Sequence, residues 1–263
     1  MSSRSARYSE KSLKRIDHII SHLDSREEDL EEAKNHIVRG TGNPIACLYS
    51  LESHALAKGM FSWFKLGELA SSKQWFYTAA VLVKKARERD FDTSGPLARK
   101  RLFLEALLSD NKEIISWSAS AEHLFNPKNM DNEKKLEYLA YNFMLGLRGE
   151  WGRLIDRCET VLKAPSSTLK RYVLDFEFYL ALAKGEESKM TEVLLELTKP
   201  KIINARSNDE SGYTDNLIST YAVIYAKTAW YHGYQITPDT PYIPSAWLPI
   251  EPLPVYQKQY SFL

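Results

Sequence analysis

The stretch LEYLAYNFMLGLRGEWGRLIDRCETVLK, residues 136–163, decides the fold class of this chain. Its first half carries apolar residues at helical spacing, namely Leu136, Ala140, Phe143 and Leu147. Its second half carries a similar stripe, Leu154, Cys158, Val161 and Leu162. Glycine often ends a helix because it adopts left-handed backbone angles without strain. Gly149-Glu150 therefore predicts a turn between the stripes, and the whole stretch predicts two antiparallel helices.

The same arrangement recurs on both sides of this stretch. Turns between apolar stripes are predicted at Asp110-Asn111, Gly149-Glu150 and Gly185-Glu186, and the intervals from 110 to 149 and from 149 to 185 are 39 and 36 residues. Stacked helical hairpins produce such spacing, and each hairpin buries its stripe on its neighbours. The units share little identity. We therefore predict an all-α fold, an irregular, repeat-like stack of antiparallel helix hairpins, with Lys201-Ile202-Ile203-Asn204 as the one short strand candidate.

Local signals divide the N-terminal part of the chain. Ser25-Arg26-Glu27-Glu28 has the pattern of a capping box, which predicts a helix that starts at Ser25 and ends at Gly40. Asn43-Pro44 predicts another helix start, because proline loses nothing at the first helical position. From there to about residue 90 the helical stripes have few breakers, and the joints are expected at Gly59 and Ser71-Ser72.

The C-terminal part combines an aromatic helix with a proline-rich tail. The segment 215–232 is apolar over more than half of a helix surface, which is typical of a helix central to a fold. Six of the eleven prolines lie between 238 and 254, among aromatic and aliphatic residues. A disordered tail would be poor in such residues. We therefore predict an extended strap packed along the helices, with proline reducing the entropy lost on ordering.

Length and composition predict one soluble domain. A chain of 263 residues can bury a large core without disulfides. We expect a single all-helical domain over 1–263, made of N-terminal helices (1–42), a helical body (43–204) and the aromatic helix plus strap (213–263). The net charge of +1 argues against a nucleic-acid partner. The absence of a long apolar run or signal segment, with only two cysteines, predicts a cytoplasmic protein without membrane spans.

No catalytic or cofactor motif stands out. The sequence contains no glycine-rich phosphate loop and no nucleophile elbow. His18 and His22 would share a helix face, yet no third metal ligand accompanies them, so a solvated surface is the better interpretation. Cys158 lies on an inward stripe and is expected to be buried. We predict no cofactor, no metal and no enzymatic activity; an enzyme with an unrecognised site is the alternative.

Charge is unevenly distributed along the chain. Residues 84–101 have a net charge of +4, and residues 24–32 have a net charge of −5. The acidic residues of the second segment are Asp24, Glu27, Glu28, Asp29, Glu31 and Glu32. Two interpretations are open, a solvated helix face or a surface that steers a basic protein partner. We take these six residues as the candidate partner-binding surface.

The C-terminal element resembles the immunity protein 49 family of bacterial toxin-neutralising proteins. The residues that carry the resemblance are 216–227 (NLISTYAVIYAK), His232-Gly233-Tyr234, 239–244 (DTPYIP) and Trp247-Leu248-Pro249, with weaker similarity at 75–80 (WFYTAA) and Arg89-Asp90-Phe91. The pattern is also similar to the C-terminal part of another helical immunity family, which guards against phosphodiesterase-like nuclease toxins.

The resemblance implies a protein that binds and neutralises a cognate toxin, delivered between competing bacteria by a type VI or contact-dependent system. A cytoplasmic immunity protein would meet a toxin that acts in the cytoplasm, such as a nuclease. The alternative from a different class is a helical-repeat adaptor for an endogenous protein partner. A toxin gene next to this one would favour the first function, and a housekeeping operon the second.

Overall fold

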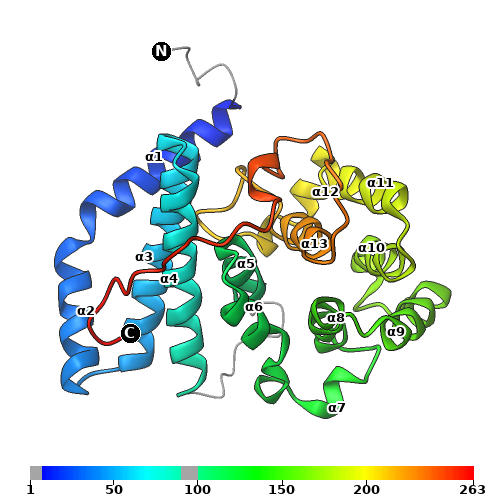
Figure 1. Ribbon diagram of the computed structural model, residues 1–263, viewed down its shortest axis with the longest axis horizontal. Helices are drawn as coiled ribbons and strands as arrows, with labels where there is room; N and C mark the ends of the chain where they lie inside the picture. The colour runs from blue at the N-terminus through cyan, green and yellow to red at the C-terminus, as the bar shows by residue number, and fades with distance from the viewer. Residues whose placement is uncertain (1–7, 90–99) are drawn as a thin grey trace.

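A computed structural model describes residues 8–89 and 100–263 of the chain, and within these residues every regular element is a helix (Figure 1). The predicted all-α fold is therefore confirmed. The first four helices form one end of the molecule and are α1 (Glu10–Ser25), α2 (Glu27–Arg39), α3 (Pro44–Phe61) and α4 (Leu69–Arg87). Helix α3 packs along α4, and both α1 and α2 lie against α3.

Two of the five expected boundaries at this end are correct. Gly40 ends α2 with a φ of 65°, and the Asn43 side chain caps α3 by accepting from the Ala46 amide at 3.1 Å. The capping box is wrong, because Ser25 is the last residue of α1 and α2 begins after Arg26 without a side-chain cap. Helix α1 continues to Ser25 because its apolar face, with Ile16 and Ile19, is buried in the core.

The joints expected at Gly59 and Ser71-Ser72 are also wrong. Both positions lie inside helices, and the break falls at a π-helical turn, Ser62–Leu66, which Gly67 ends at a φ of 73°. Gly59 serves packing instead. A Cβ at this position would lie 2.7 Å from Cε1 of Phe76, so glycine permits the close approach of α3 and α4.

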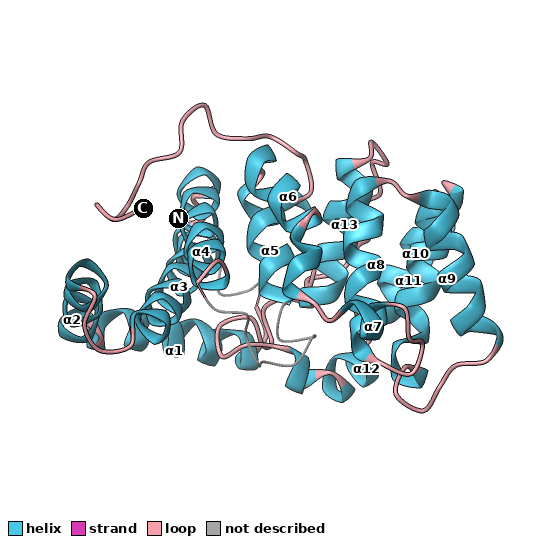
Figure 2. Ribbon diagram, turned by 90° about the horizontal axis from the view of Figure 1, so that it is seen from below, coloured by secondary structure: helices cyan, strands magenta, loops and turns pink. Residues whose placement is uncertain are grey.

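The three predicted hairpins form the body of the molecule. They pair α5 (Lys100–Ser109) with α6 (Lys112–Ala119), α8 (Leu136–Arg148) with α9 (Trp151–Lys163), and α10 (Val173–Lys184) with α11 (Glu187–Leu197). The turn residues Asp110, Gly149 and Gly185 have φ values of 58°, 68° and 70°, so all three predicted turns are confirmed. Seen from below, the helices stand side by side in a row from α2 to α9 (Figure 2).

Short helices complete the stack. Two are α-helical, α7 (Pro127–Met130) and α12 (Pro200–Ala205), and 3-10 turns cover Ala121–Leu124, Lys170–Tyr172, Ser207–Asp209 and Ser245–Trp247. Helix α12 replaces the expected strand at 201–204. Pro200 at its first position favours a helix start, and the described residues include no strand with which the segment pairs.

Helix α13 (Thr220–Tyr231) occupies the centre of the body, where it contacts α5, α8, α10 and α11. Every residue from Thr220 to Ala229 is buried, as expected for a helix apolar on most of its surface. The helix starts later than the predicted residue 215, because Asn216 adopts a φ of 62°. The Glu210 carboxylate accepts from the Thr220 amide at 2.8 Å and so caps the helix.

After α13 the chain forms the predicted strap, which returns across α5 and α4 to the N-terminal helices (Figure 1). Trp247 is 2% exposed and meets the edges of Phe64 and Phe76, with ring centroids 5.8 and 5.5 Å away. The packed strap confirms the prediction. It brings the C-terminal residues against α2, α3 and α4, where a candidate site lies.

Candidate partner-binding cleft

The six acidic residues identified from the sequence lie at the junction of α1 and α2, and all six are exposed. Asp24 is near the end of α1, and the other five belong to α2. Glu27, Glu28 and Asp29 form the first turn of α2, where carboxylates interact favourably with the helix dipole. Part of this charge therefore stabilises α2 itself.

Half of these carboxylates have a basic side chain within ion-pair distance. Asp29 pairs with Arg26 at 2.7 Å, Glu31 with Lys34 at 2.5 Å, and Glu32 lies 3.4 Å from His36. Asp24, Glu27 and Glu28 form no ion pair with any residue in the ranges 8–89 and 100–263. These three carboxylates are therefore exposed without a basic partner from the described residues.

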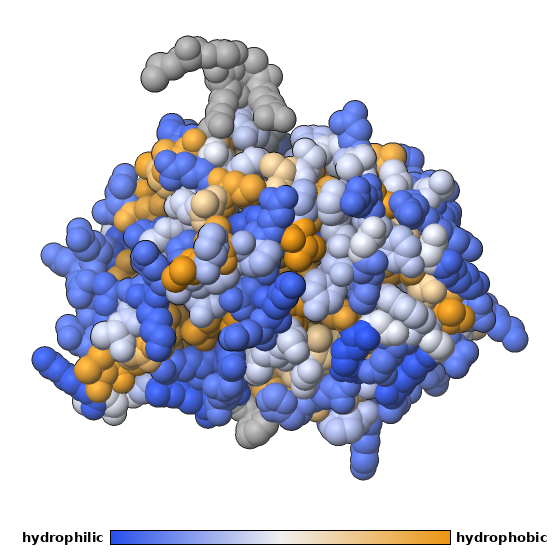
Figure 3. Space-filling model, in the orientation of Figure 1, coloured by the Kyte–Doolittle hydropathy of each residue, from blue (hydrophilic) through white to orange (hydrophobic). Residues whose placement is uncertain are grey.

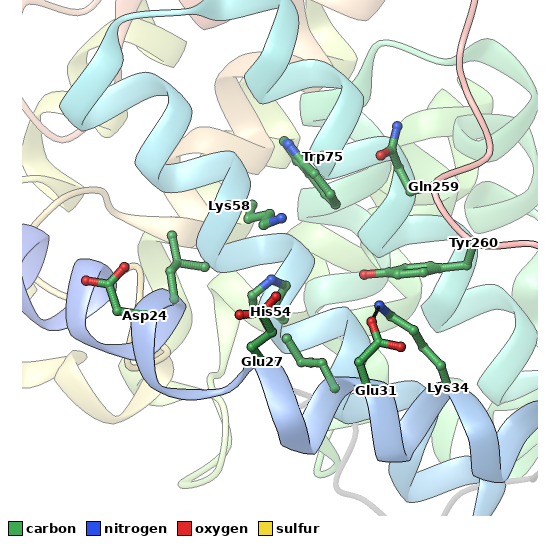
Figure 4. Close-up of a pocket in the computed structure, with 11 residues that line it drawn as sticks. Asp24, Glu27, Glu31, Lys34, His54, Lys58, Trp75, Gln259 and Tyr260 are labelled. Atoms are coloured by element: carbon green, nitrogen blue, oxygen red, sulfur yellow. Dashed lines mark hydrogen bonds and ion pairs between the residues drawn. The ribbon is translucent and has the colours of Figure 1, made fainter.

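Three of the six residues, Asp24, Glu27 and Glu31, line a cleft of about 570 Å³ (Figure 4). Its other lining residues are Leu23, Leu30, Lys34, His54, Lys58, Trp75, Gln259 and Tyr260. The walls come from α1, α2, α3, α4 and the C-terminal tail, which are far apart in the sequence. Glu28, Asp29 and Glu32 are not among the lining residues. A second cavity, of about 430 Å³, lies between Trp63, Phe64 and the segment 238–246.

His54 is the most buried polar group in the cleft, with 6% of its surface exposed. Its Nδ1 atom has no hydrogen-bond partner among the described residues, and its ring lies 5.9 Å from that of His22. Burial lowers the pKa of His54 to about 4, and the charges of Lys58, His22 and Lys34 act in the same direction. His54 is therefore a neutral imidazole at pH 7, with one donor and one acceptor nitrogen.

Lys58 lies one helical turn after His54 and points across the cleft (Figure 4). Its ammonium is 4.4 Å from the centroid of the Trp75 ring, a cation–π contact. No carboxylate of the described residues pairs with it. Burial, and then the charge of Lys34, lower the pKa of Lys58 below its usual value.

The C-terminal tail forms the remaining wall. Tyr260 stacks on Phe262 with ring centroids 5.4 Å apart, and the Lys34 ammonium lies 5.7 Å from the Tyr260 ring. The Lys85 ammonium donates to the Phe262 carbonyl and holds the tail on α4. Burial raises the pKa of Tyr260 to about 12, and the charge of Glu31 contributes. Tyr260 is therefore a neutral phenol at physiological pH.

The histidine pair considered as half of a metal site has a packing role. The Tyr213 hydroxyl lies 3.0 Å from Nδ1 of His22, and the Tyr213 ring stacks on His18 at 6.1 Å. The sequence predicted a solvated surface for this pair. His18 is exposed as predicted, but His22 is half-buried because it packs against Tyr213. Within residues 8–89 and 100–263, no three His, Cys, Asp or Glu side chains group as metal ligands would.

Two further sequence interpretations can be compared with the structure. Cys158 is fully buried, as predicted, and burial raises the pKa of its thiol to about 12, so a thiolate is disfavoured. Part of the basic segment 84–101 lies outside the described residues. Its described start packs against aromatic rings, with Lys84 5.6 Å from Trp117 and Lys85 5.7 Å from Phe262.

A buried ionic cluster was not anticipated from the sequence. Asp110, at the first hairpin turn, accepts from the Lys227 ammonium through Oδ1 and from Lys73 at 2.8 Å through Oδ2. Lys227 also donates to the Trp247 carbonyl at 2.8 Å, and Lys73 to that of Glu251 at 2.7 Å. We call Asp110, Lys73 and Lys227 the strap latch. A lysine within an otherwise apolar helix was the signal that could have indicated it.

Helices account for the regular structure of the described residues, and their exposed face is mainly polar with small, separate apolar groups (Figure 3). None of the helices in residues 8–89 and 100–263 is both long and apolar enough to cross a bilayer. These features define an all-α protein of stacked helical hairpins, with a charged cleft at one end.

A family model described as Immunity protein 49 matches residues 59–247, and the chain belongs to this family. The membership confirms the resemblance seen in the C-terminal element, and it extends through the helical body. It places the chain among immunity proteins, which act in general by binding a toxin partner rather than by catalysis. Searches among curated proteins and among solved structures found no match.

The family match and the cleft overlap very little. Every lining residue except Trp75 lies before residue 59 or after residue 247. The matched span holds the hairpin stack, α13 and the first part of the strap, including Asp110, Lys73 and Lys227. Most of the segments that build the cleft therefore lie outside the matched span.

Proposed function

We propose that this protein binds a cognate antibacterial toxin and neutralises it by direct contact, without chemistry of its own. The observation that carries the proposal is the family match across residues 59–247. We further propose that the chain acts as one unit. One cluster of buried residues, which runs from Ile16 in α1 to Leu248 in the strap, supports this reading.

We place the encounter in the cytoplasm and propose a nuclease as the toxin. Cys47 and Cys158 are both free thiols, as is typical of a reducing compartment. A nuclease must attract a polyanion and therefore carries a basic surface. The acidic face formed by Asp24 and α2 is complementary to such a surface, and it would speed the encounter by electrostatic steering.

Co-expression with the toxin encoded by the neighbouring gene tests the proposal. We expect this protein to protect cells from the toxin and to co-elute with a catalytically inactive toxin on gel filtration. If cells are not protected and no complex forms, the proposal is wrong. A housekeeping operon around the gene would then favour the helical-repeat adaptor.

Charge reversal tests the acidic face separately. Changing Glu27, Glu28, Glu31 and Glu32 to lysine should slow association with the toxin, with a larger effect at low salt. A matched control reverses Glu159, Glu186, Glu187 and Glu192, four exposed carboxylates of α9 and the α10–α11 hairpin. The two variants have the same net charge, so a loss confined to the first locates the contact on α2. Equal losses would contradict this location.

A further inference from the structure

The cleft between α2, α3 and the tail has two layers of opposite charge. Its rim carries the carboxylates Asp24, Glu27 and Glu31, all exposed. Its floor carries the ammonium of Lys58 beside the buried imidazole of His54. The charges that act most on His54 are Lys58, His22, Lys34 and Arg26, all basic groups. The floor is therefore electropositive beneath an acidic rim.

The floor has hydrogen-bonding capacity that the chain itself leaves unused. An ammonium has three donors, and the printed contact of Lys58 is with the face of Trp75. His54 is more than nine-tenths buried, and its Nδ1 atom has no partner among the described residues. Buried polar groups are almost always satisfied, so the unpartnered buried imidazole beside a half-buried ammonium indicates a place for a ligand.

Lys34 is a second lysine of the cleft, and unlike Lys58 it has a carboxylate partner. Lys34 lines the same cleft, and its ammonium is 2.5 Å from the Glu31 carboxylate. Lys58 has an equivalent charge and a similar degree of burial, and it has no such carboxylate within residues 8–89 and 100–263. An external anion would give Lys58 the kind of partner that Glu31 gives Lys34.

We propose that the cleft is the socket for a carboxylate side chain at the tip of a toxin loop, held by Lys58 and His54 and flanked by basic residues that meet the acidic rim. This inference rests on the proposed function and names the chemistry of the contact. Lys58 donates to the carboxylate, and His54 donates through its N–H. Trp75 and Tyr260 provide apolar walls for the stem of the inserted side chain.

The acidic rim selects against other anions. A nucleotide or another polyphosphate would carry several negative charges past Asp24 and Glu27, which have no ion pair among the described residues, and repulsion would oppose its entry. A toxin loop that carries a single carboxylate between basic side chains avoids this repulsion. Its carboxylate meets the basic floor, and its basic side chains meet the acidic rim. The cleft thereby imposes a basic–acidic–basic pattern on its partner, which is a specificity that the acidic face alone would not provide.

Titration calorimetry of the inactive toxin against variants tests the inference. Lys58→Met keeps the stem on Trp75 and removes the charge, and we expect binding weaker by about 30-fold or more, as for truncation of one partner of a buried charge pair. Lys189→Met, on exposed α11 at the other end of the stack, is the control and should bind as the wild type. Lys58→Gln is a second neutral variant, and thermal melting checks that each variant is folded.

Double-mutant cycles identify the inserted group. Each surface Asp and Glu of the toxin is changed to Ala and measured against both the wild type and Lys58→Met. Removal of one particular toxin carboxylate should weaken binding to the wild type by about 10-fold or more. The same removal should weaken binding to Lys58→Met far less.

The outcomes separate this inference from the function on which it rests. If the wild type binds and protects while both neutral Lys58 variants bind equally well, the socket is wrong and the proposed function stands. If the Lys58 variants bind weakly but no toxin carboxylate couples to them, the carboxylate assignment is overturned. A toxin that does not bind the wild type overturns both.

Discussion

Lys227 in the strap latch and Lys58 in the cleft place the same side chain in two different settings. Lys227 is fully enclosed, and its ammonium meets the Asp110 carboxylate and the Trp247 carbonyl. Lys58 is half-buried and meets the face of Trp75. Burial lowers the pKa of both, that of Lys227 to about 8.

The difference lies in which groups satisfy the charge. In the latch, the chain supplies every partner from segments far apart in the sequence, so the charges help to fix where the strap lies. In the cleft, the chain brings a half-buried cation and a buried histidine together, and neither has a charged partner among the described residues. The satisfied charges of the latch indicate a role in the fold, and the proposed binding role of the cleft rests on its unpartnered groups.

Asp110→Asn should have the largest effect on stability. Asparagine tolerates the positive φ of this turn, so the variant removes the charge while keeping the shape. Lys227 and Lys73 would then be buried without a carboxylate, at a cost of about 3–5 kcal/mol. Urea unfolding measures this. Glu192→Ala, in an exposed pair with Lys189, should cost less than about 1 kcal/mol. Equal effects would show that the latch contributes no more than a surface pair.

Gly59→Ala tests the packing beneath the cleft, next to Lys58. The added methyl group would meet the Phe76 ring at 2.7 Å, and overpacking of this kind costs about 1–3 kcal/mol. Gly152→Ala in α9 is the matched control, because no atom lies within 4 Å of its added Cβ. That change should stabilise by up to about 1 kcal/mol through helix propensity. A stabilising Gly59→Ala in thermal melting would contradict the close packing of α3 and α4.

Lys227 should make stability depend on pH. Its pKa is about 8 in the folded state and about 10.5 in the unfolded state, so between these values the unfolded chain binds more protons. The Lys227 contribution to the free energy of unfolding therefore rises with pH across this window. In Lys227→Met this rise should be absent. Guanidinium unfolding at several pH values from 7.5 to 9.5 compares the two proteins, and parallel pH profiles would show that Lys227 titrates normally.

Lys58→Met should have the smallest effect on stability. The contact with Trp75 is worth about 0.5–1 kcal/mol, and methionine keeps most of the apolar stem. Removing the charge also relieves repulsion from Lys34. Thermal unfolding should therefore place this variant close to the wild type. A loss as large as that of Asp110→Asn would mean that Lys58 has a structural role like that of Lys227.

The sequence predicted the hairpin stack because its signals are local. Asp110, Gly149 and Gly185 end helices through their own backbone angles, and each apolar stripe is read within one helix. The capping box at Ser25 failed because packing of α1 on the core extended that helix through the cap position. The joint predicted at Gly59 is wrong because the close packing of Phe76, rather than a turn, requires a glycine at this position.

The sequence predicted only part of the candidate site, because its signals are local and the cleft joins segments that are far apart in the chain. The acidic residues form one continuous block, so their proximity followed from the sequence, although only Asp24, Glu27 and Glu31 line the cleft. His54, Lys58 and Tyr260 come from α3 and the tail, and helical periodicity does not determine that these segments meet α2. The latch joins Asp110 to Lys227 across 117 positions, and periodicity within helices leaves that pairing open as well.

Hydrogen–deuterium exchange with and without the inactive toxin tests the central claim most directly, because it reports on both regions in one measurement. The account predicts added protection at residues 24–34, 54–58 and 259–263 when the toxin is bound. Residues 220–231, in α13, should remain equally protected in both states. Added protection confined to α9, α10 and α11, with no change around the cleft, would contradict the account.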